Sequence, residues 1–335
     1  MKPSKKRLPS LIALLLLITF PAETLAWGEV GHHLVVRLAI RRLETTAPSV
    51  RGQINGILNG EKLLRATMWP DGARFVAPYL ETYNNHFVDI PFSRINYIDS
   101  KDCEFVQGDR AGDCVIHALD RYSAVLLAPG QSPKARRDAL AFILHFVGDM
   151  HQPMHAIKRD DDKGGNSRKL CVLIDSAEEC YDDEDQREKK NLHAAWDKYI
   201  IEFTGLSENE YFDELSQRLD AMSPSQIAAI EQGTTVKWAE DAHNIARLNA
   251  YNIGNKRPDG FYHITSGYYT ENLPRVNQQL LFAGIRLALV LREIFIDRHA
   301  HPSLNAQPPN IMASPEPVPQ PRARRRRRRA RNRGQ

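Results

Sequence analysis

Two histidine–aspartate pairs with the same spacing stand out in this sequence. His145 precedes Asp149 by four residues, and His193 precedes Asp197 by four residues. Because residues four apart lie on one face of an α-helix, each pair would project two ligand atoms in the same direction. Imidazole nitrogen and carboxylate oxygen are the donors that a catalytic zinc ion prefers. Each pair is therefore a candidate helical metal-binding motif.

Three more residues of the same types strengthen this interpretation. His155 follows in GDMHQPMH, while Asp71 in MWPDGAR and His86 in HFVD lie upstream. Taken singly, each histidine is more simply explained as a structural or exposed residue, and one such pair arises by chance in a long helix. Together, the two pairs and three further candidates indicate a metal site. Ligand types alone specify neither the number of metal ions nor the reaction.

The hydrophobic periodicity of the segments that must position these residues predicts helices. Ser132–Pro133 is a typical N-cap and first-turn pair, and it predicts a long helix through Met150 that Pro153 ends. Alternating strand patterns are scarce, and residues 86–98 and 169–174 are the two modest candidates. Further helices are expected from Val30 to Leu43, from Ser223–Pro224–Ser225 to about Ile253, and from Asn272 to Asp297. The pattern predicts a mainly α fold with minor β content, in one large domain at residues 27–300.

Residues 1–26 differ in composition from this domain. They combine a basic start with the apolar run LIALLLLITF and small residues before Trp27. The run is too short to span a bilayer, and the whole pattern is typical of a secretory signal peptide. We expect cleavage before Trp27 and a secreted or periplasmic protein; the alternative is an uncleaved membrane anchor.

The charge is unevenly distributed along the chain. The formal net charge is +4, but residues 1–26 carry +3 and residues 321–335 carry +9, so the part between them carries about −8. Residues 301–321 are rich in Pro and lack periodicity, which predicts a disordered linker, and residues 322–335 predict a disordered Arg-rich tail. Such a tail can bind polyanions. The overall pI is therefore a poor guide to what the folded domain binds.

Four cysteines follow the expected signal peptide. Export favours two disulfides, and the short spacings favour pairing Cys103 with Cys114 and Cys171 with Cys180, although four cysteines allow three pairings. Neither pair has CxxC spacing, so zinc binding by sulfur is not expected.

Six motifs carry a resemblance to a known family. WGEVGHH, MWPDGAR, HFVD, HFVGDMHQPMH, DDKGGN and NLHAAWD, in this order, resemble the zinc-dependent single-strand nucleases and 3'-nucleotidases of the P-one/S-one type. That family shares its helical scaffold with bacterial zinc phospholipases C. The resemblance runs from Trp27 to the last expected helix and leaves out the Arg-rich tail.

This resemblance implies three zinc ions (Zn²⁺) per chain. Asp71, His86 and His145 would hold one ion. Trp27 and His32 would hold a second, with Asp149 bridging these two ions. The third ion would be held by His155, His193 and Asp197.

The implied role of Trp27 agrees with the expected signal cleavage. A backbone amide nitrogen cannot act as an amine ligand, whereas a new N-terminus can. The reference pKa of an α-amino group is roughly 8, so a metal displaces its proton at small cost near neutral pH. Cleavage after Ala26 would expose Trp27 itself.

The resemblance also implies substrate contacts. Arg74 would act in catalysis by clamping the phosphate in the transition state, beside Asp149 at the bridged zinc pair. Phe87 would stack on a nucleobase and Asp89 would accept hydrogen bonds from its edge, which favours unpaired bases. Asn166 could contact substrate. Ordinary structural roles, in the core, at the surface or in a turn, are the alternatives for Arg74, Phe87 and Asn166.

The leading hypothesis is therefore a monomeric, secreted zinc endonuclease. It would cut single-stranded DNA and RNA to 5'-phosphorylated products and could also act as a 3'-nucleotidase. The first alternative is a zinc phospholipase C on the same scaffold, against which Asp197, Arg74 and the HFVD segment argue. The second is a non-catalytic, polyanion-binding secreted protein governed by its Arg tail.

Overall fold

The computed structural model describes residues 27–108, 111–174, 177–179 and 190–302. The expected signal peptide, most of the expected linker, and the Arg-rich tail lie outside these residues. Cys180 does as well, so its pairing with Cys171 stays a prediction. The expected disulfide between Cys103 and Cys114 is confirmed.

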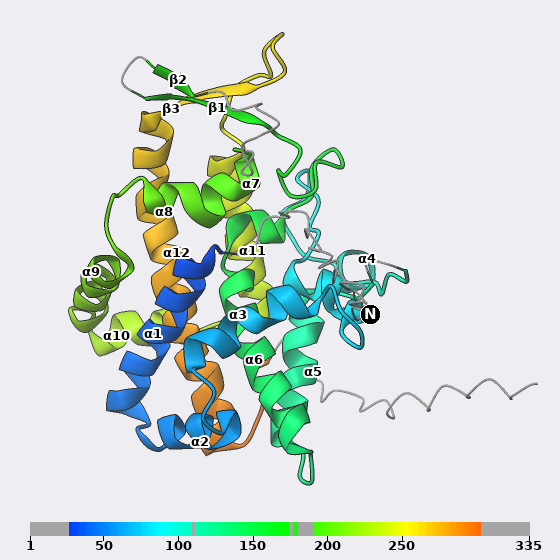
Figure 1. Ribbon diagram of the computed structural model, residues 1–335, viewed down its shortest axis with the longest axis vertical. Coiled ribbons are helices and arrows are strands. Elements are labelled where there is room, and N and C mark those ends of the chain that lie inside the picture. Colours follow the sequence, from blue (N-terminus) through cyan, green and yellow to red (C-terminus); the bar gives the residue numbers. More distant parts are fainter. Residues whose placement is uncertain (1–26, 109–110, 175–176, 180–189, 303–335) are drawn as a thin grey trace, which may run out of the picture. The chain divides into compact units, whose positions relative to one another are not determined.

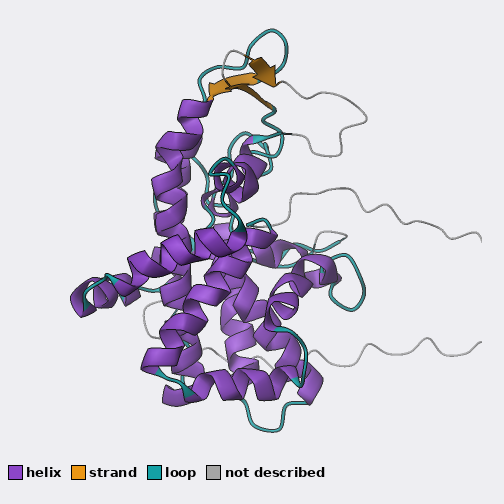
Figure 2. Cartoon of the chain, turned by 60° about the vertical axis from the view of Figure 1, so that its left-hand side comes forward, coloured by secondary structure: helices purple, strands orange, loops and turns teal. Residues whose placement is uncertain are grey.

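Helices make up most of the described chain, as expected (Figure 2). The α-helices are α1 (Glu29–Thr46), α2 (Ser49–Leu58), α3 (Leu63–Ala73), α4 (Asp99–Asp102), α5 (Val115–Leu127), α6 (Pro133–Met150), α7 (Leu192–Ala194), α8 (Ile200–Glu202), α9 (Glu208–Asp220), α10 (Pro224–Glu231), α11 (Thr235–Ile245) and α12 (Ser266–Arg292). Shorter 3₁₀ segments are η1 (Leu80–His86) and η2 (Pro153–Ala156), and π-helical segments are η3 (Ala195–Tyr199), η4 (Ala246–Ala250) and η5 (Glu293–Asp297). No described helix is long and apolar enough to cross a membrane.

Helix α6 is the element around which the site is built. Ser132 accepts a hydrogen bond from the Ala135 backbone N–H at 3.1 Å, and Pro133 occupies the first turn, so the helix begins where its sequence predicts. Every residue from Asp138 to Met150 is buried, because α6 packs against α1, α3, α5 and α12 (Figure 1). A helix buried on all sides holds its polar residues in fixed positions.

Helices α1 and α12 pack closely against each other. A Cβ atom at Gly284 would lie 2.6 Å from the Cβ of Leu38, so this approach requires glycine. The expected helix at 272–297 exists but begins earlier, at Ser266, and it continues past Arg292 as η5.

The helix expected from residue 223 to about residue 253 is wrong as a single element. It is divided into α10 and α11 because Gly233 has a φ of +95° and Thr234 caps a new helix by accepting a hydrogen bond from Lys237 N–H.

A small sheet lies at one end of α12 (Figure 1). Strand β1 (Leu170–Ile174) pairs antiparallel with β2 (Ala177–Glu179) and parallel with β3 (Tyr262–Thr265), with Val172 opposite both Glu179 and Ile264. The expected strand at 169–174 is thus confirmed. The candidate at 86–98 is wrong, because this segment pairs only through an isolated bridge between Pro91 and Lys158, and proline has no N–H for a ladder.

Among the described residues, 301 and 302 belong to the domain although the expected boundary is residue 300. The ring of His301 is buried and stacks on Trp238 at 4.4 Å, and its Nδ1 lies 2.8 Å from the Glu293 carboxylate. The carbonyl oxygen of Pro302 accepts a hydrogen bond from Thr235 N–H. These contacts join residues 301–302 to the domain.

Candidate metal centre

Three groups of buried imidazoles and carboxylates lie where the helices meet. Each group could hold a metal ion, since its ligand atoms lie within 4.8 Å of one another. The residues come from α1, α3, η1, α6, η2, α7 and η3, so elements far apart in sequence meet at one place. The groups are His32, His145 and Asp149; Asp71, His86 and His145; and His155, His193 and Asp197.

Asp149 lies at the centre of the first two groups. Its Oδ2 lies 3.0 Å from His86 Nδ1 and 3.2 Å from His145 Nε2, and its Oδ1 lies 3.4 Å from His32 Nε2. The Asp71 Oδ1 atom lies 3.6 Å from the same nitrogens of His86 and His145. The two oxygens of Asp149 therefore face different sets of imidazoles, while His145 belongs to both of the first two groups.

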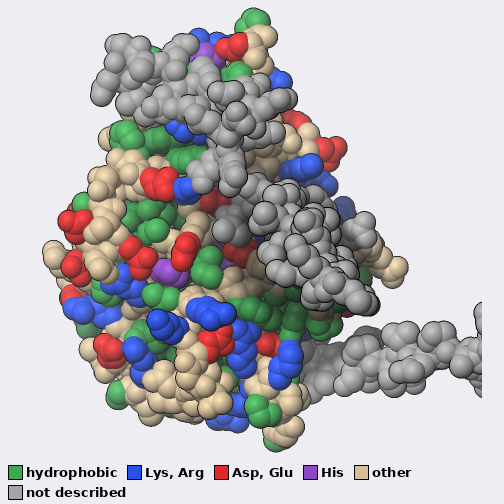
Figure 3. Space-filling model, viewed as in Figure 1, with side chains coloured by type: hydrophobic (Ala, Val, Ile, Leu, Met, Phe, Trp, Pro, Cys, Tyr) green, Lys and Arg blue, Asp and Glu red, His purple; other side chains and the backbone are tan. Residues whose placement is uncertain are grey.

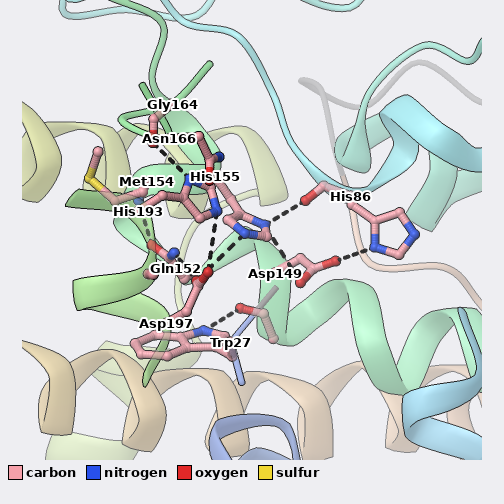
Figure 4. A network of polar contacts seen from close by, with 12 residues as sticks. Trp27, His86, Asp149, Gln152, Met154, His155, Gly164, Asn166, His193 and Asp197 are labelled. Atoms are coloured by element: carbon pink, nitrogen blue, oxygen red, sulfur yellow. Dashed lines mark hydrogen bonds and ion pairs between the residues drawn. The ribbon is translucent and has the colours of Figure 1, made fainter. Parts of the chain in front are cut away.

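The third group lies beside Asp149 (Figure 4). Its Asp197 carboxylate lies 3.4 Å from His193 Nε2 and 3.8 Å from His155 Nε2. Asp197 belongs to the π-helical turn η3, and such turns are frequent at functional sites. The Gln152 side-chain amide donates to Asp197 while its carbonyl oxygen accepts from Met154 N–H. Gln152 thus orients the carboxylate.

Backbone carbonyl groups orient three of the imidazole rings. The Nδ1 atom of His145 lies 2.9 Å from Thr67 O, that of His155 lies 2.8 Å from His86 O, and that of His193 lies 2.7 Å from Gly164 O. An N–H that donates to a carbonyl fixes the tautomer, and each Nε2 is then left as the acceptor that a metal requires.

Burial and nearby charges shift the pKa values of the side chains in this cluster away from their usual values. Burial lowers the pKa of His32 and of His86 to about 4. Burial also lowers the pKa of His145, but the nearby charges of Asp149 and Asp71 outweigh it and raise this pKa to about 10. For Asp197, burial raises the pKa well above its usual value. Carboxylates and imidazoles are thus buried together, and their charges shift one another's pKa values strongly.

The residues present fit a set of metal ions. Several buried ligand atoms have no hydrogen-bond partner, although buried polar groups are normally satisfied. A divalent cation would compensate both the missing contacts and the buried negative charge. The orphaned atoms that face the groups are His32 Nε2, Asp71 Oδ1 and Oδ2, Asp149 Oδ1 and Asp197 Oδ2, and the opposite ring nitrogens His32 Nδ1 and His86 Nε2 are also orphaned.

Trp27 lies against the same cluster with its ring fully buried. Its indole N–H donates to Gly148 O at 2.8 Å (Figure 4). A Cβ atom at Gly148 would lie 2.9 Å from His32 Nδ1, and one at Gly31 would lie 2.9 Å from Trp27 Cβ. Two glycines therefore allow the first residue of the domain to approach α6.

Arg74 ends helix α3 beside the second group. Its guanidinium lies 3.5 Å from Asp71 Oδ1, and its Nε is buried with no hydrogen-bond partner. The guanidinium carbon lies 5.1 Å from the centre of the Phe75 ring and 5.5 Å from that of Tyr83. Cation–π contacts rather than hydrogen bonds thus hold much of this side chain.

Phe87 and Asp89, which follow His86 in sequence, line a cavity, whereas Asn166 donates a hydrogen bond to Lys163 O within its own turn. Burial raises the pKa of Asp89 to about 6, and the charge of Lys158 opposes this increase.

Two histidines next to candidate ligands point elsewhere. His33 Nδ1 lies 3.1 Å from Glu208, and His151 contacts Val147 O and Arg286.

Sequence reasoning missed the residues that support the candidate ligands. Gln152 stands in HQPMH between two histidines, and its position next to Pro153 was the available signal. Phe75 directly follows Arg74, but Tyr83 approaches only through folding. The carbonyl groups of Thr67 and Gly164 carry no side-chain signal at all.

Comparisons with known proteins cover the same region. The S1/P1 nuclease family model matches residues 27–296. Endonuclease 1 of Arabidopsis thaliana is 29% identical over 311 residues, which is 89% of this chain and 96% of the relative. Nuclease S1 of Aspergillus oryzae is 25% identical over 284 residues (79% and 90%), and nuclease P1 of Penicillium citrinum is 26% identical over 290 residues (80% and 97%).

Metal content should follow the grouping of these ligands. We expect Asp197→Asn to remove about one ion per chain and Asp149→Asn about two, because Asp149 faces two groups. Elemental analysis of purified protein measures this. Asp138→Asn is the control, since Asp138 is a buried carboxylate on the same helix that pairs with Tyr79, Lys134 and Arg137. Equal metal content in all three variants would contradict the assignment.

Proposed function

The chain belongs to the S1/P1 nuclease family and is a hydrolase of phosphodiester bonds, and from this premise we propose a secreted zinc enzyme that cuts single-stranded DNA and RNA. Its products would carry 5'-phosphates, and it would also remove phosphate from 3'-nucleotides. The single observation that carries this proposal is the set of buried, orphaned histidine and aspartate atoms around Asp149.

Zinc is the proposed metal because all the side-chain donors are imidazoles and carboxylates. Asp71, His86 and His145 would hold one ion, and His155, His193 and Asp197 another. The amine and carbonyl oxygen of Trp27 and the ring of His32 would hold the remaining ion, with Asp149 shared. When bound, zinc supplies Lewis-acid stabilisation of phosphate oxygens and lowers the pKa of water.

The chain's own residues position the substrate around this centre. In the hydrolysis, water oxygen bonds to phosphorus and the bond to the 3' oxygen breaks, so the 5'-phosphate stays on the product. Arg74 would donate to phosphate oxygens as negative charge develops there, and cation–π contacts with Phe75 and Tyr83 pre-orient it.

Phe87 and Asp89 would recognise a base. The Phe87 ring provides a stacking surface that every base can use, which favours single strands. The Asp89 carboxylate accepts hydrogen bonds only when ionised. Because its pKa is raised to about 6, this contact strengthens as pH rises above that value.

Two predictions test the enzyme chemistry and its N-terminus. For the first, Arg74→Ala should lower kcat on single-stranded DNA by about 10²–10³, because one charge-stabilising donor is worth that much. Arg74→Lys should recover part of this loss, since lysine keeps the charge but not the bidentate geometry. Metal content should stay unchanged in both variants. A kcat of Arg74→Ala within a few-fold of wild type would refute the role of Arg74. Separately, wild-type protein that hydrolyses phosphatidylcholine and not nucleic acid would support the phospholipase alternative.

The second prediction concerns Trp27. We expect exported protein to begin at Trp27, and a variant with one alanine ahead of it to lose about one metal ion, because one residue moves the amine by about 3.3–3.6 Å. N-terminal sequencing and elemental analysis check this. A full metal complement in the extended variant would contradict amine coordination.

The Arg-rich tail is proposed to capture polyanionic substrate rather than to act in chemistry. On the face seen in Figure 3, acidic and basic side chains of the described residues are intermixed, and the part of the chain between its two basic ends carries about −8. Nine arginines in residues 321–335 would therefore supply attraction that the domain lacks. The enzyme is proposed to act as a monomer.

Removing the tail tests this role. Truncation after Pro302, which keeps the buried His301, should raise KM for long single-stranded DNA at low salt and leave dinucleotide turnover unchanged. Kinetics at two salt concentrations, with the full-length protein as control, measure this. Loss of dinucleotide turnover would show that the tail takes part in catalysis.

A further inference from the structure

The cavity beside the metal centre is larger than one nucleobase requires. Its volume is about 760 Å³, and its lining includes Phe87 and Asp89, which follow the candidate ligand His86 in sequence, as well as Phe92 and Arg159. Pockets of this volume accommodate drug-sized ligands. Base recognition at Phe87 uses one end, so the other end has no role in the proposed function as described so far.

Two segments that leave the metal cluster together form one wall of this cavity. One segment is residues 86–92, which begins at His86. The other is residues 155–159, which begins at His155. They are joined by backbone hydrogen bonds from Val88 N–H to His155 O, from Lys158 N–H to Ile90 O, and from Phe92 N–H to Lys158 O, at 2.8–2.9 Å. The wall is therefore a continuous extension of the site.

Several side chains of this wall line the cavity. Val88 and Ile90 are buried in the core, while Phe87, Asp89, Pro91 and Phe92 line the cavity. The wall is not a regular strand, because Ile90 N–H donates to Val88 O at 3.1 Å. Phe87 and Phe92 are five residues apart in sequence, so their rings are two distinct stacking surfaces on the cavity lining.

The outer end carries a preformed stacking surface. The guanidinium carbon of Arg159 lies 4.1 Å from the centre of the Phe92 ring and 5.0 Å from that of Tyr251, and the two rings contact each other edge to face at 5.4 Å. A guanidinium held in this way is planar and pre-oriented, and nucleobases stack on arginine planes as they do on aromatic rings.

A cation lies between the two ends. The Lys158 side chain is half exposed, and its ammonium lies 3.9 Å from Asp161, which is 93% exposed, so this ion pair is weak. Two other charges on the lining are paired within the protein, Arg94 with Asp102 and Asp113 with Arg121. The lining also carries Lys101 and Glu104, and Asp160 lies 3.5 Å from Arg159 Nε. Lys158, paired among the described residues only with the exposed Asp161, is the lining cation placed to meet a phosphate.

We propose that this cavity is an extended subsite for a second nucleotide of a single strand, with its base stacked on the Arg159–Phe92 pair and its phosphate beside Lys158. The inference rests on the proposed function and names the substrate it prefers. An oligonucleotide would occupy both ends of the cavity, whereas a dinucleotide that spans the cleaved bond would occupy only the Phe87 end.

The test compares binding of short and long strands. Zinc-loaded mature protein is titrated with hydrolysis-resistant phosphorothioate thymidylates of two and six nucleotides, and the ratio of their Kd values is measured. Arg159→Ala should reduce the advantage of the hexanucleotide about five- to tenfold, because stacking of one base contributes that much. Arg159→Lys should not restore it, because lysine keeps the charge but offers no planar surface.

Arg37→Ala is the matched control. Arg37 is also stacked on an aromatic ring, 4.0 Å from the centre of Phe212, and it pairs with Glu208 away from the cavity. This variant should keep the wild-type ratio. The subsite is refuted if Arg159→Ala leaves the ratio unchanged, if it weakens both ligands equally, or if Arg159→Lys restores the ratio fully. Failure of the wild-type protein to cut single strands would instead refute the proposed function, and the binding ratio would still decide the subsite.

Discussion

Burial of Asp149 among imidazoles is the constraint on which the rest of the structure depends. Its two oxygens face His32 on one side and His86 with His145 on the other, all without solvent exposure. A buried carboxylate is costly unless cations and hydrogen bonds compensate it. The surrounding imidazoles contact this carboxylate, but its Oδ1 and several neighbouring ligand atoms have no hydrogen-bond partner, and the group could hold a metal ion. Helix α6 can present Asp149 there only because α1, α3, α5 and α12 cover it.

The same constraint explains the supporting features of the site. Carbonyl groups of Thr67, His86 and Gly164 orient three rings, and Gln152 orients Asp197. Gly31 and Gly148 allow the chain start to approach α6. These residues determine where each ligand atom lies. The segments that follow His86 and His155 line the cavity, so the proposed substrate site is built on the same backbone as the candidate ligands.

Only part of this arrangement could be predicted from the sequence. The bounds of α6 followed from Ser132, Pro133 and helical periodicity, and the His145–Asp149 pair followed from spacing. The meeting of Asp71, His86 and His32 with that pair joins three separate elements, so spacing could not predict it, and the family resemblance supplied it. The break at Gly233 and the loss of the strand at 86–98 depend on one left-handed residue and one proline. The contacts of Tyr83 and His301 depend on tertiary packing alone.

The central claim is that the three buried groups hold metal ions, and anomalous diffraction at the zinc edge from crystals of the mature protein tests it most directly. The account predicts three anomalous peaks, each within coordination distance of one group. Crystals grown with zinc that show no peak among these residues, or show peaks only at surface histidines, would contradict it.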